Sequence, residues 1–335
     1  MTASTDERAP GVALLFPGQG AQHPRMAAGL YGRLDVFTDA MDEAFRQLGP
    51  EGARLRAEWL APEPSPLYDD VTVAQPLLYA VGLALGRLVL SWGAEPVALL
   101  GHSVGELVAA TLAGVLAAED GFRLMRQRVH QFAGTPAGGM LAVAAPLAEV
   151  GDVLGDGVYL AAVNAHRQLL LAGRREDLDR AARVLLERGL VCRDARARQA
   201  FHSPVVDDAV TASLPDWQAT PLHPPRLPVY SAYTQGPLTG RTACDPVFWA
   251  RQAAEPVQFA PTLDRLLSDH ACLLVEAGPG NSLSMLARRH RAVVRGASRV
   301  LPLLPDRPRG DDADLASALA VRERVRGLRV QESPA

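Results

Sequence analysis

Apolar positions along the chain form short compact runs separated by longer stretches with helical periodicity. The runs at 12–16, 96–100 and 271–276 are apolar and end at glycine-containing loops, which predicts buried strands. Buried strands that alternate with helices predict an α/β fold with a parallel sheet. Further strands are expected at 224–232 and 300–304, and helices at 26–34, 36–47, 75–92, 107–113, 118–133, 205–214, 247–254, 257–268 and 311–325.

The segment between residues 138 and 198 has a different pattern. Strands are expected at 140–144, 158–163, 168–172 and 190–194, with helices at 147–154 and 175–188. The order strand, helix, strand, strand, helix, strand is that of a ferredoxin-like unit. We therefore expect an inserted small subdomain at 137–199, and a large domain formed by 1–136 together with 200–335.

The sequence Gly-His-Ser-Val-Gly-Glu at 101–106 stands between an expected strand and an expected helix. A Gly-x-Ser-x-Gly turn in this context forces a sharp reversal and presents the serine hydroxyl at a helix N-terminus, where the helix dipole favours negative charge. This favours Ser103 as a nucleophile for acyl chemistry. The alternative interpretation is a turn of small residues around a buried serine.

Composition excludes several classes of protein. The 335 residues are 48% hydrophobic, which allows a large core, and no apolar run approaches the length of a membrane span. The polar residues 1–10 show no secretory signal, and Cys192, Cys244 and Cys272 are too far apart in sequence to suggest a metal site. A net charge of −3 gives no support for nucleic-acid binding. We expect a reduced, cytoplasmic protein without metal or membrane.

A serine nucleophile needs a base and donors for an oxyanion. The loop at 17–22 follows a buried strand and contains two glycines, so the backbone N–H of Gln19 could face a substrate oxygen; an ordinary tight turn is the alternative. Among eight histidines, His202 lies at the junction of the small unit and the main domain, where a cleft is expected. The side chain of His102 is expected to point away from the serine hydroxyl and to be structural.

Four motifs occur in one order along nearly the whole chain, at 16–22, 101–106, 200–204 and 276–280. Together they resemble the malonyl-CoA:acyl-carrier-protein transacylase family, which includes the acyltransferase domains of polyketide synthases. The resemblance implies an α/β-hydrolase-like core with an inserted ferredoxin-like subdomain. That fold agrees with the insertion expected from the pattern of residues alone.

The resemblance also implies a ping-pong acyl transfer. Ser103 would attack an acyl-CoA thioester, and the phosphopantetheine thiol of an acyl carrier protein would then take the acyl group. His202 would act as base and acid, and the backbone amides of Gln19 and Val104 would form the oxyanion hole. The family orients its histidine with backbone carbonyls, one of them from the stretch at 255–258, so Asp207 and Asp208 need not take part. No cofactor is implied.

In the family an arginine 25 residues after the nucleophile pairs with the free carboxylate of a malonyl-type substrate, which implies Arg128. Arg126 is the alternative, because two residues apart on a helix places them on different faces. Val129 departs from the usual glycine or serine. Phe201 before the histidine, with Val104 after the serine, favours malonyl over methylmalonyl, although Gln199 departs from the pattern of malonyl-type relatives. Gln75 and Asn164 match positions near the substrate, and Gln75 could alternatively cap a helix.

The carrier partner is acidic, so we expect it to dock on arginines near the cleft. Arg288, Arg289 and Arg193 are the leading candidates, and a solubilising charge cluster is the alternative. Three further arginines are considered with them: Arg196, Arg198 and Arg291.

Several functions remain open at this point. The leading hypothesis is a discrete enzyme of polyketide or fatty-acid biosynthesis that acts in trans and loads malonyl onto a carrier. The alternatives are transfer of methylmalonyl or a non-dicarboxylic acyl group, including transfer between two carriers, hydrolysis of acyl thioesters, and a scaffold without catalysis. The presence of both Ser103 and His202 argues against the scaffold.

Overall fold

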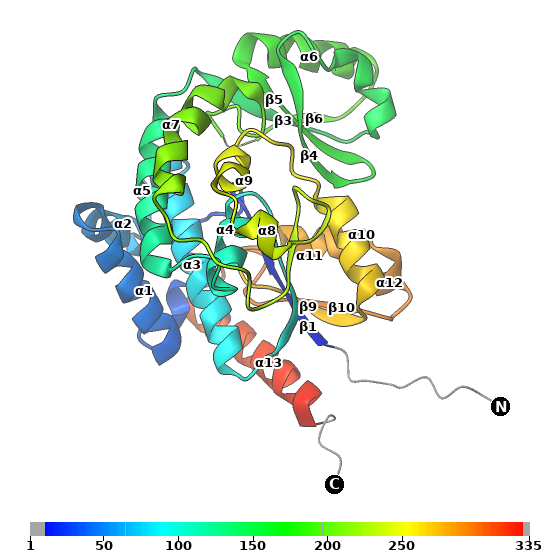
Figure 1. Cartoon of the computed structure of the whole chain (residues 1–335). Helices are drawn as coiled ribbons and strands as arrows, with labels where there is room; N and C mark the ends of the chain where they lie inside the picture. Colours follow the sequence, from blue (N-terminus) through cyan, green and yellow to red (C-terminus); the bar gives the residue numbers. More distant parts are fainter. Residues whose placement is uncertain (1–10, 64, 196, 331–335) are drawn as a thin grey trace, which may run out of the picture.

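The computed structural model describes residues 11–63, 65–195 and 197–330 and contains two separate sheets (Figure 1). The larger sheet has six strands in the order β10-β9-β1-β2-β7-β8, and the smaller has four in the order β4-β5-β3-β6. The predicted mixed α/β fold, with a parallel sheet and a second antiparallel unit, is confirmed.

Strands of the large sheet are parallel, except where β8 pairs antiparallel with β7. Alternate residues of a strand point to opposite faces, and both faces are buried here, which explains the continuous apolar runs. In β1, Leu14 and Phe16 enter the core on one face while Ala13 and Leu15 enter the core on the other. The strands are β1 Gly11–Phe16, β2 Pro96–Gly101, β7 Val229–Ser231, β8 Gly236–Pro237, β9 Cys272–Glu276 and β10 Arg299–Pro302.

Helices cover both faces of the large sheet (Figure 1). One face packs against α1 Asp35–Gln47, α3 Val71–Ser91, α4 Val104–Leu112, α5 Ala118–Ala133, α7 Asp207–Gln218 and α13 Asp311–Val330. The other face packs against α10 Phe259–Asp269, α11 Ser282–Ala287 and α12 Arg291–Val294. Two short helices, α8 Gly240–Ala243 and α9 Pro246–Arg251, lie between β8 and α10 in the chain.

Helix α3 corrects one expectation from composition. Its 21 residues, Val71–Ser91, are long and apolar enough to cross a membrane, with a mean hydropathy of 1.6 over the best window. However, 89% of that window is buried inside the protein, which is the environment of a core helix. Asp70 caps the helix by accepting a hydrogen bond from the Thr72 N–H. Gln75, proposed as a possible cap, instead lies inside the helix.

The small sheet is antiparallel throughout and carries α6 Arg175–Glu187. The helix expected at 147–154 is wrong: the segment forms two 3-10 turns, Leu147–Glu149 and Gly151–Val153. Only Val150 of this segment is buried, so little apolar surface is available to stabilise a helix there. The strands are β3 Gly138–Val143, β4 Val158–Ala165, β5 Gln168–Arg174 and β6 Cys192–Asp194.

Near the N-terminus one further expectation was wrong, and one helix was not predicted. The helix at 26–34 is a single 3-10 turn, Ala28–Leu30, because Arg25 and Ala27 adopt positive φ of 56° and 61°, which no α-helix accommodates. A helix that the pattern did not predict, α2 Pro50–Leu60, follows Gly49. Proline is favoured at the first helical position, so Pro50 starts α2 rather than breaking it.

Backbone hydrogen bonds join the end of β4 to the segment between α9 and α10. The Val163 N–H donates to the Val257 carbonyl at 2.9 Å, and the Val257 N–H donates to the Ala161 carbonyl at 2.9 Å. The strand β4 therefore contacts the segment between α9 and α10. Any group held by that segment is positioned by both sheets.

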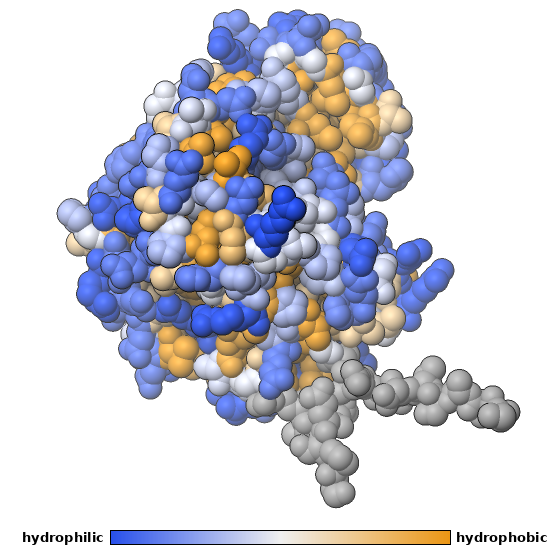
Figure 2. All heavy atoms as spheres, viewed as in Figure 1, coloured by the Kyte–Doolittle hydropathy of each residue, from blue (hydrophilic) through white to orange (hydrophobic). Residues whose placement is uncertain are grey.

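Most of the surface in the view of Figure 2 is hydrophilic, and apolar residues gather on the part that carries the small sheet. Exposed apolar side chains of that part of the chain include Leu147, Leu186 and Val191. The carboxyl ends of β1, β2 and β7 all lead into loops at one edge of the large sheet, which is where parallel α/β sheets place their ligands.

We expect Gly101→Ala to destabilise the fold. A Cβ at position 101 would overlap the backbone of Gly105 and Glu106, which passes directly over the end of β2. Overpacking against backbone should lower the free energy of unfolding by about 1–3 kcal/mol or more, measured by denaturant titration. Gly151→Ala is the control, because no atom lies within 4 Å of its added Cβ. Equal stability of the two variants would contradict this account of the turn.

Candidate active site

The turn between β2 and α4 presents Ser103 to solvent. Ser103 occupies the N-cap of α4 with φ 55° and ψ −120°, and its side chain makes no capping hydrogen bond. A non-glycine residue in this region of backbone space is strained, and such strain is concentrated at functional sites. Gly18 passes so close that an added Cβ would lie 2.6 Å from the His102 carbonyl oxygen and 3.2 Å from the Ser103 Cβ.

Ser103 precedes the small sheet in the sequence and His202 follows it, but the two residues meet in the fold. The Ser103 Oγ lies 2.9 Å from His202 Nε2, although 99 residues separate them. His202 also has positive φ, 62°, and its N–H donates to the Ala253 carbonyl at 2.6 Å. The structure therefore brings together the serine and histidine singled out from the sequence.

Backbone carbonyls fix the protonation of the His202 ring. Its Nδ1 lies 3.1 Å from the Gln252 carbonyl oxygen and 2.9 Å from that of Glu255. Carbonyl oxygens only accept, so Nδ1 carries the proton and Nε2 is free to accept from the Ser103 hydroxyl. Neither Asp207 nor Asp208 takes this place. Burial, and then the neighbouring charges of His102 and Arg128, lower the pKa of His202 to about 3, so the ring is neutral at pH 7.

The oxyanion role expected from the sequence falls on the backbone amides of Gln19 and Val104. Val104 is the first residue of α4, where an N–H has no acceptor within its own helix. Gln19 follows Gly18, where an added Cβ would lie 3.2 Å from the Ser103 Cβ. Among the residues that the structure describes, no backbone hydrogen bond outside regular elements uses the N–H of Gln19. Both amides are available for the oxyanion role expected from the sequence.

Arg128, on α5, reaches toward the same loop. Its Nε donates to Gln75 Oε1 at 3.3 Å, and Gln75 Nε2 donates to Gln19 Oε1 at 3.0 Å. Burial lowers the pKa of Arg128, although the guanidinium remains charged. In the described part of the chain no ion pair between Arg128 and a carboxylate is found. Arg126 faces elsewhere, with its guanidinium beside Gly49.

Aromatic rings connect Arg128 to the histidine. The Arg128 guanidinium lies 4.9 Å above the centre of the Phe132 ring, a cation–π contact. The Phe132 and Phe201 rings are 5.1 Å apart, and Phe201 is 6.4 Å from the His202 ring. Phe201 is thus a buried wall between the arginine and the histidine.

His102 and Asn164 form a separate pair. His102 Nε2 lies 2.8 Å from Asn164 Oδ1, so the imidazole is bound to β4 rather than to the neighbouring Ser103. Burial lowers the pKa of His102, while the hydrogen bond to Asn164 opposes this. The structural role expected for His102 agrees with this contact. Asn164 touches His102, and its expected contact with substrate stays a prediction.

The docking arginines do not form one cluster. Arg289 lines a pocket of about 690 Å³ between the β4–β5 hairpin and α10–α12, together with Arg167, Arg291 and Asn164. Arg288 is exposed but does not line this pocket. Arg193 lies on β6, the opposite edge of the small sheet from β4, and Arg196 lies outside the described residues.

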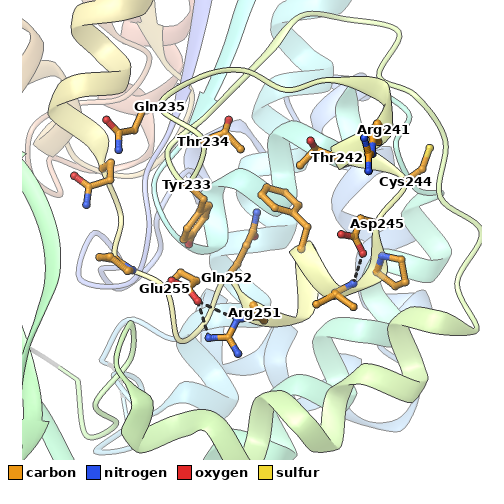
Figure 3. A pocket seen from close by; sticks show the side chains of 15 residues that line it. Tyr233, Thr234, Gln235, Arg241, Thr242, Cys244, Asp245, Arg251, Gln252 and Glu255 are labelled. Atoms are coloured by element: carbon orange, nitrogen blue, oxygen red, sulfur yellow. Dashed lines mark hydrogen bonds and ion pairs between the residues drawn. The ribbon is translucent and has the colours of Figure 1, made fainter.

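A second pocket of about 730 Å³ lies behind the histidine, beside Gln252 and Glu255 (Figure 3). Tyr233 lines it, and its ring centre is 6.3 Å from that of His202. Sequence reasoning did not single out Tyr233, Gln252 or Glu106 for function. The signal for Tyr233 was its place just after a parallel strand.

Among the described residues no group of three or more histidine, cysteine or acidic side chains is arranged to hold a metal ion. The site contains the Ser103 hydroxyl, the His202 imidazole and the partly buried guanidinium of Arg128.

Known proteins resemble this chain in sequence and in fold. Residues 13–316 match the family described as acyl transferase domain. A phenolphthiocerol/phthiocerol polyketide synthase protein of Mycobacterium tuberculosis is 36% identical over 289 residues, 86% of this chain and 19% of that protein. The spectinabilin polyketide synthase system protein NorB of Streptomyces orinoci is 35% identical over 287 residues, 83% of this chain and 13% of that protein. The chain spans less than a fifth of these relatives.

Solved structures have the same fold. The acyl transferase domain of SpnD, in complex with 2-(pent-4-yn-1-yl)malonyl, is 32% identical, with a TM-score of 0.88 over 96% of this chain and 78% of that one. The malonyl CoA-acyl carrier protein transacylase FabD of Coxiella burnetii is 24% identical, with a TM-score of 0.80 over 95% of this chain and 98% of that one. At this identity the second likeness shows the fold alone.

We expect reaction of Ser103 with a fluorophosphonate probe to be nearly independent of pH between 5 and 7. A histidine base works only above its pKa, and the pKa of His202 is lowered to about 3. With an ordinary pKa of about 6.5 the rate would fall more than about tenfold over this range. The rate of the mass increase at Ser103 measures this, with Ser103→Ala as the unlabelled control. A tenfold fall toward pH 5 would contradict the buried, neutral imidazole.

Proposed function

The chain belongs to the acyl transferase domain family, and on that premise we propose that it transfers malonyl from coenzyme A to the phosphopantetheine thiol of an acyl carrier protein. The observation that carries the proposal is the hydrogen-bonding distance of 2.9 Å between Ser103 Oγ and His202 Nε2. No resident cofactor is needed, because the acyl group arrives already activated as a thioester.

In the first half-reaction the Ser103 hydroxyl attacks the thioester carbonyl while His202 Nε2 takes its proton. The amides of Gln19 and Val104 hold the oxyanion of the tetrahedral intermediate. Collapse of the intermediate breaks the carbon–sulfur bond, and His202 returns the proton to the leaving thiolate of coenzyme A. The product is a malonyl ester of Ser103.

In the second half-reaction the carrier thiol takes the place of coenzyme A. His202 accepts the thiol proton as the sulfur attacks the ester, and then returns that proton to the Ser103 oxygen. The Gln252 and Glu255 carbonyls support the positive ring that forms in each step. Attack of water on the same ester would be hydrolysis, the competing outcome.

The position of Arg128 favours a substrate that carries a free carboxylate. A partly buried guanidinium without an acidic partner in the described chain is suited to a bidentate pair with a carboxylate. Gln75 holds Arg128 from one side and Phe132 holds it from the other. The Phe201 ring limits the space between Arg128 and His202, which favours malonyl over larger groups branched at the α-carbon.

The pocket lined by Arg167, Arg289 and Arg291 supports an acidic carrier as partner. Asn164, at the edge of that pocket, binds His102, the residue next to Ser103. A phosphopantetheine arm held by these arginines would therefore start beside the nucleophile. We assign the carrier to a separate polypeptide, so that transfer occurs in trans.

The first test is acylation by malonyl-CoA. We expect the wild type to gain the mass of one malonyl group, and Ser103→Ala and His202→Ala to gain none within the same time. Purified carrier protein, added afterwards, should take the malonyl group from Ser103, so that the enzyme loses the added mass and the carrier gains it. Loss of the mass to water at the same rate without carrier would indicate a hydrolase. If malonyl-CoA adds no mass, a panel of acetyl-CoA, methylmalonyl-CoA and carrier-bound acyl groups identifies a different donor. If the enzyme gains mass with none of these donors, the proposal is contradicted.

The second test removes the carboxylate partner. Arg128→Ala should lower kcat/KM for malonyl-CoA by about 10- to 100-fold, because a charge-assisted pair is lost, and should leave acetyl-CoA unaffected or improved. Arg126→Ala is the matched control on the same helix, with its side chain beside Gly49. Equal loss in the two variants, or equal loss with malonyl and acetyl donors, would refute the role of Arg128.

The third test reverses charge at the pocket. Arg289→Glu should raise the KM for the carrier by about fivefold while the acylation of Ser103 is retained, because exposed charges act mainly on encounter. Arg183→Glu, an exposed arginine on α6 that does not line the pocket, is the control. An unchanged carrier KM in Arg289→Glu would count against docking at this surface.

A further inference from the structure

Glu106 is a fully buried carboxylate three residues after Ser103. Its exposed fraction is 0%; burial raises the pKa of Glu106, while hydrogen bonds from the Ser231 side chain, the Ala232 N–H and the Gln252 side chain oppose that rise and favour the ionised carboxylate. No arginine takes part in those bonds in the described chain. Burial of an acidic group without a cation is unfavourable unless it is well hydrogen-bonded. The contacts of Glu106 therefore need an explanation.

Both oxygens of Glu106 accept hydrogen bonds from the loops that surround His202. The Ala232 N–H donates to Oε2 at 2.9 Å, just after β7. Gln252 Nε2 donates to Oε1 at 3.1 Å, just after α9. The carboxylate thus connects the first turn of α4, which carries the nucleophile, to two segments that are distant in sequence.

Gln252 belongs to the segment that orients the imidazole. Its carbonyl and that of Glu255 both accept from His202 Nδ1. The segment is held again at its other end, where the Gln258 N–H donates to the Ala232 carbonyl at 2.7 Å. Figure 3 shows Gln252 and Glu255 on this segment, beside the β7 loop that carries Tyr233. Glu106 therefore contacts both the start of the segment and the residue that holds its end.

These contacts form a closed circuit of covalent and hydrogen bonds. It runs from Ser103 through the first turn of α4 to Glu106, through the Gln252 side chain to the Gln252 carbonyl, through His202, and back to Ser103 Oγ. We propose that Glu106 is a positioning residue that fixes His202 relative to Ser103 by holding the Gln252 segment, an inference that rests on the proposed acyl transfer. Glu106 does not touch the reacting atoms itself.

A carboxylate suits this position better than an amide. The Ala232 N–H and Gln252 Nε2 each donate to one oxygen of Glu106, so both oxygens must accept, and the Ser231 hydroxyl is a third hydrogen-bonding partner. Glutamine at position 106 would direct an NH2 group at one of the two donors. The loop with the unmatched donor would then shift, and a displacement of about 1 Å at a reacting group can lower a rate by about a hundredfold.

The kinetic test compares four variants by the rate of Ser103 acylation at saturating malonyl-CoA. Glu106→Gln and Gln252→Met should each slow acylation by about 10- to 100-fold with KM little changed. The double variant Glu106→Gln with Gln252→Glu restores one donor to each acceptor, and its acylation rate should recover to within about threefold of the wild-type rate. Glu276→Gln is the control, since Glu276 is an equally buried carboxylate that binds the N–H groups of Leu283 and Ser284. It should lower thermal stability without slowing acylation per folded molecule.

A second measurement needs no substrate. The 15N shifts of the His202 ring should show one tautomer in the wild type, protonated at Nδ1, and averaging between tautomers in Glu106→Gln; His202→Ala identifies the signal among eight histidines. The proposal would be overturned if Glu106→Gln had the wild-type 15N shifts and the wild-type acylation rate. It would also be overturned if the double variant Glu106→Gln with Gln252→Glu recovered neither the shifts nor the rate. If wild-type protein is acylated by no thioester, the proposed function fails, and the ring shifts still decide the role of Glu106.

Discussion

The site depends on one hydrogen bond, that between Ser103 Oγ and His202 Nε2. It can form only if His202 keeps its Nδ1 proton directed at the Gln252 and Glu255 carbonyls, which leaves Nε2 as an acceptor. Both residues adopt positive φ, so the fold holds strained backbone on each side of the bond. The surrounding structure must supply the free energy that keeps this arrangement.

Two sheets supply that support. The large parallel sheet places Ser103 at the end of β2, and the small antiparallel sheet holds the histidine-orienting segment through β4 and Val257. Asn164, also on β4, fixes His102 beside the serine. The small sheet, whose strands lie in the chain between β2 and β7, therefore contacts the residue beside Ser103 and the segment that binds His202.

Electrostatics in the site follow from burial. His202 is kept neutral by burial and by nearby positive charge, as a base must be. Arg128 keeps its charge although burial disfavours it, and the described chain offers it an amide and an aromatic ring instead of a carboxylate. An anionic group on the substrate would relieve that cost, which connects the position of Arg128 to the class of acyl group proposed.

Much of this was determined by the sequence itself. Apolar runs identified the strands of the large sheet other than β8, because burial on both faces requires continuous hydrophobic residues. Local patterns also identified the turn at Ser103, and the resemblance to the acyltransferase family, which the family match confirms, pointed to His202 and Arg128. Segments at 26–34 and 147–154 were wrongly expected to be helices, since positive φ at Ala27 and sparse burial around Val150 are set by packing.

Tertiary structure alone decided the rest. The local sequence pattern does not show that Arg128 rather than Arg126 approaches Gln75, because both lie on one helix and only the orientation of that helix separates them. Likewise, Glu106 and Gln252 are 146 residues apart and meet only because α4 and the segment after α9 pack together. Periodicity and motifs report on neighbours in sequence, whereas these contacts depend on how distant elements lie against each other.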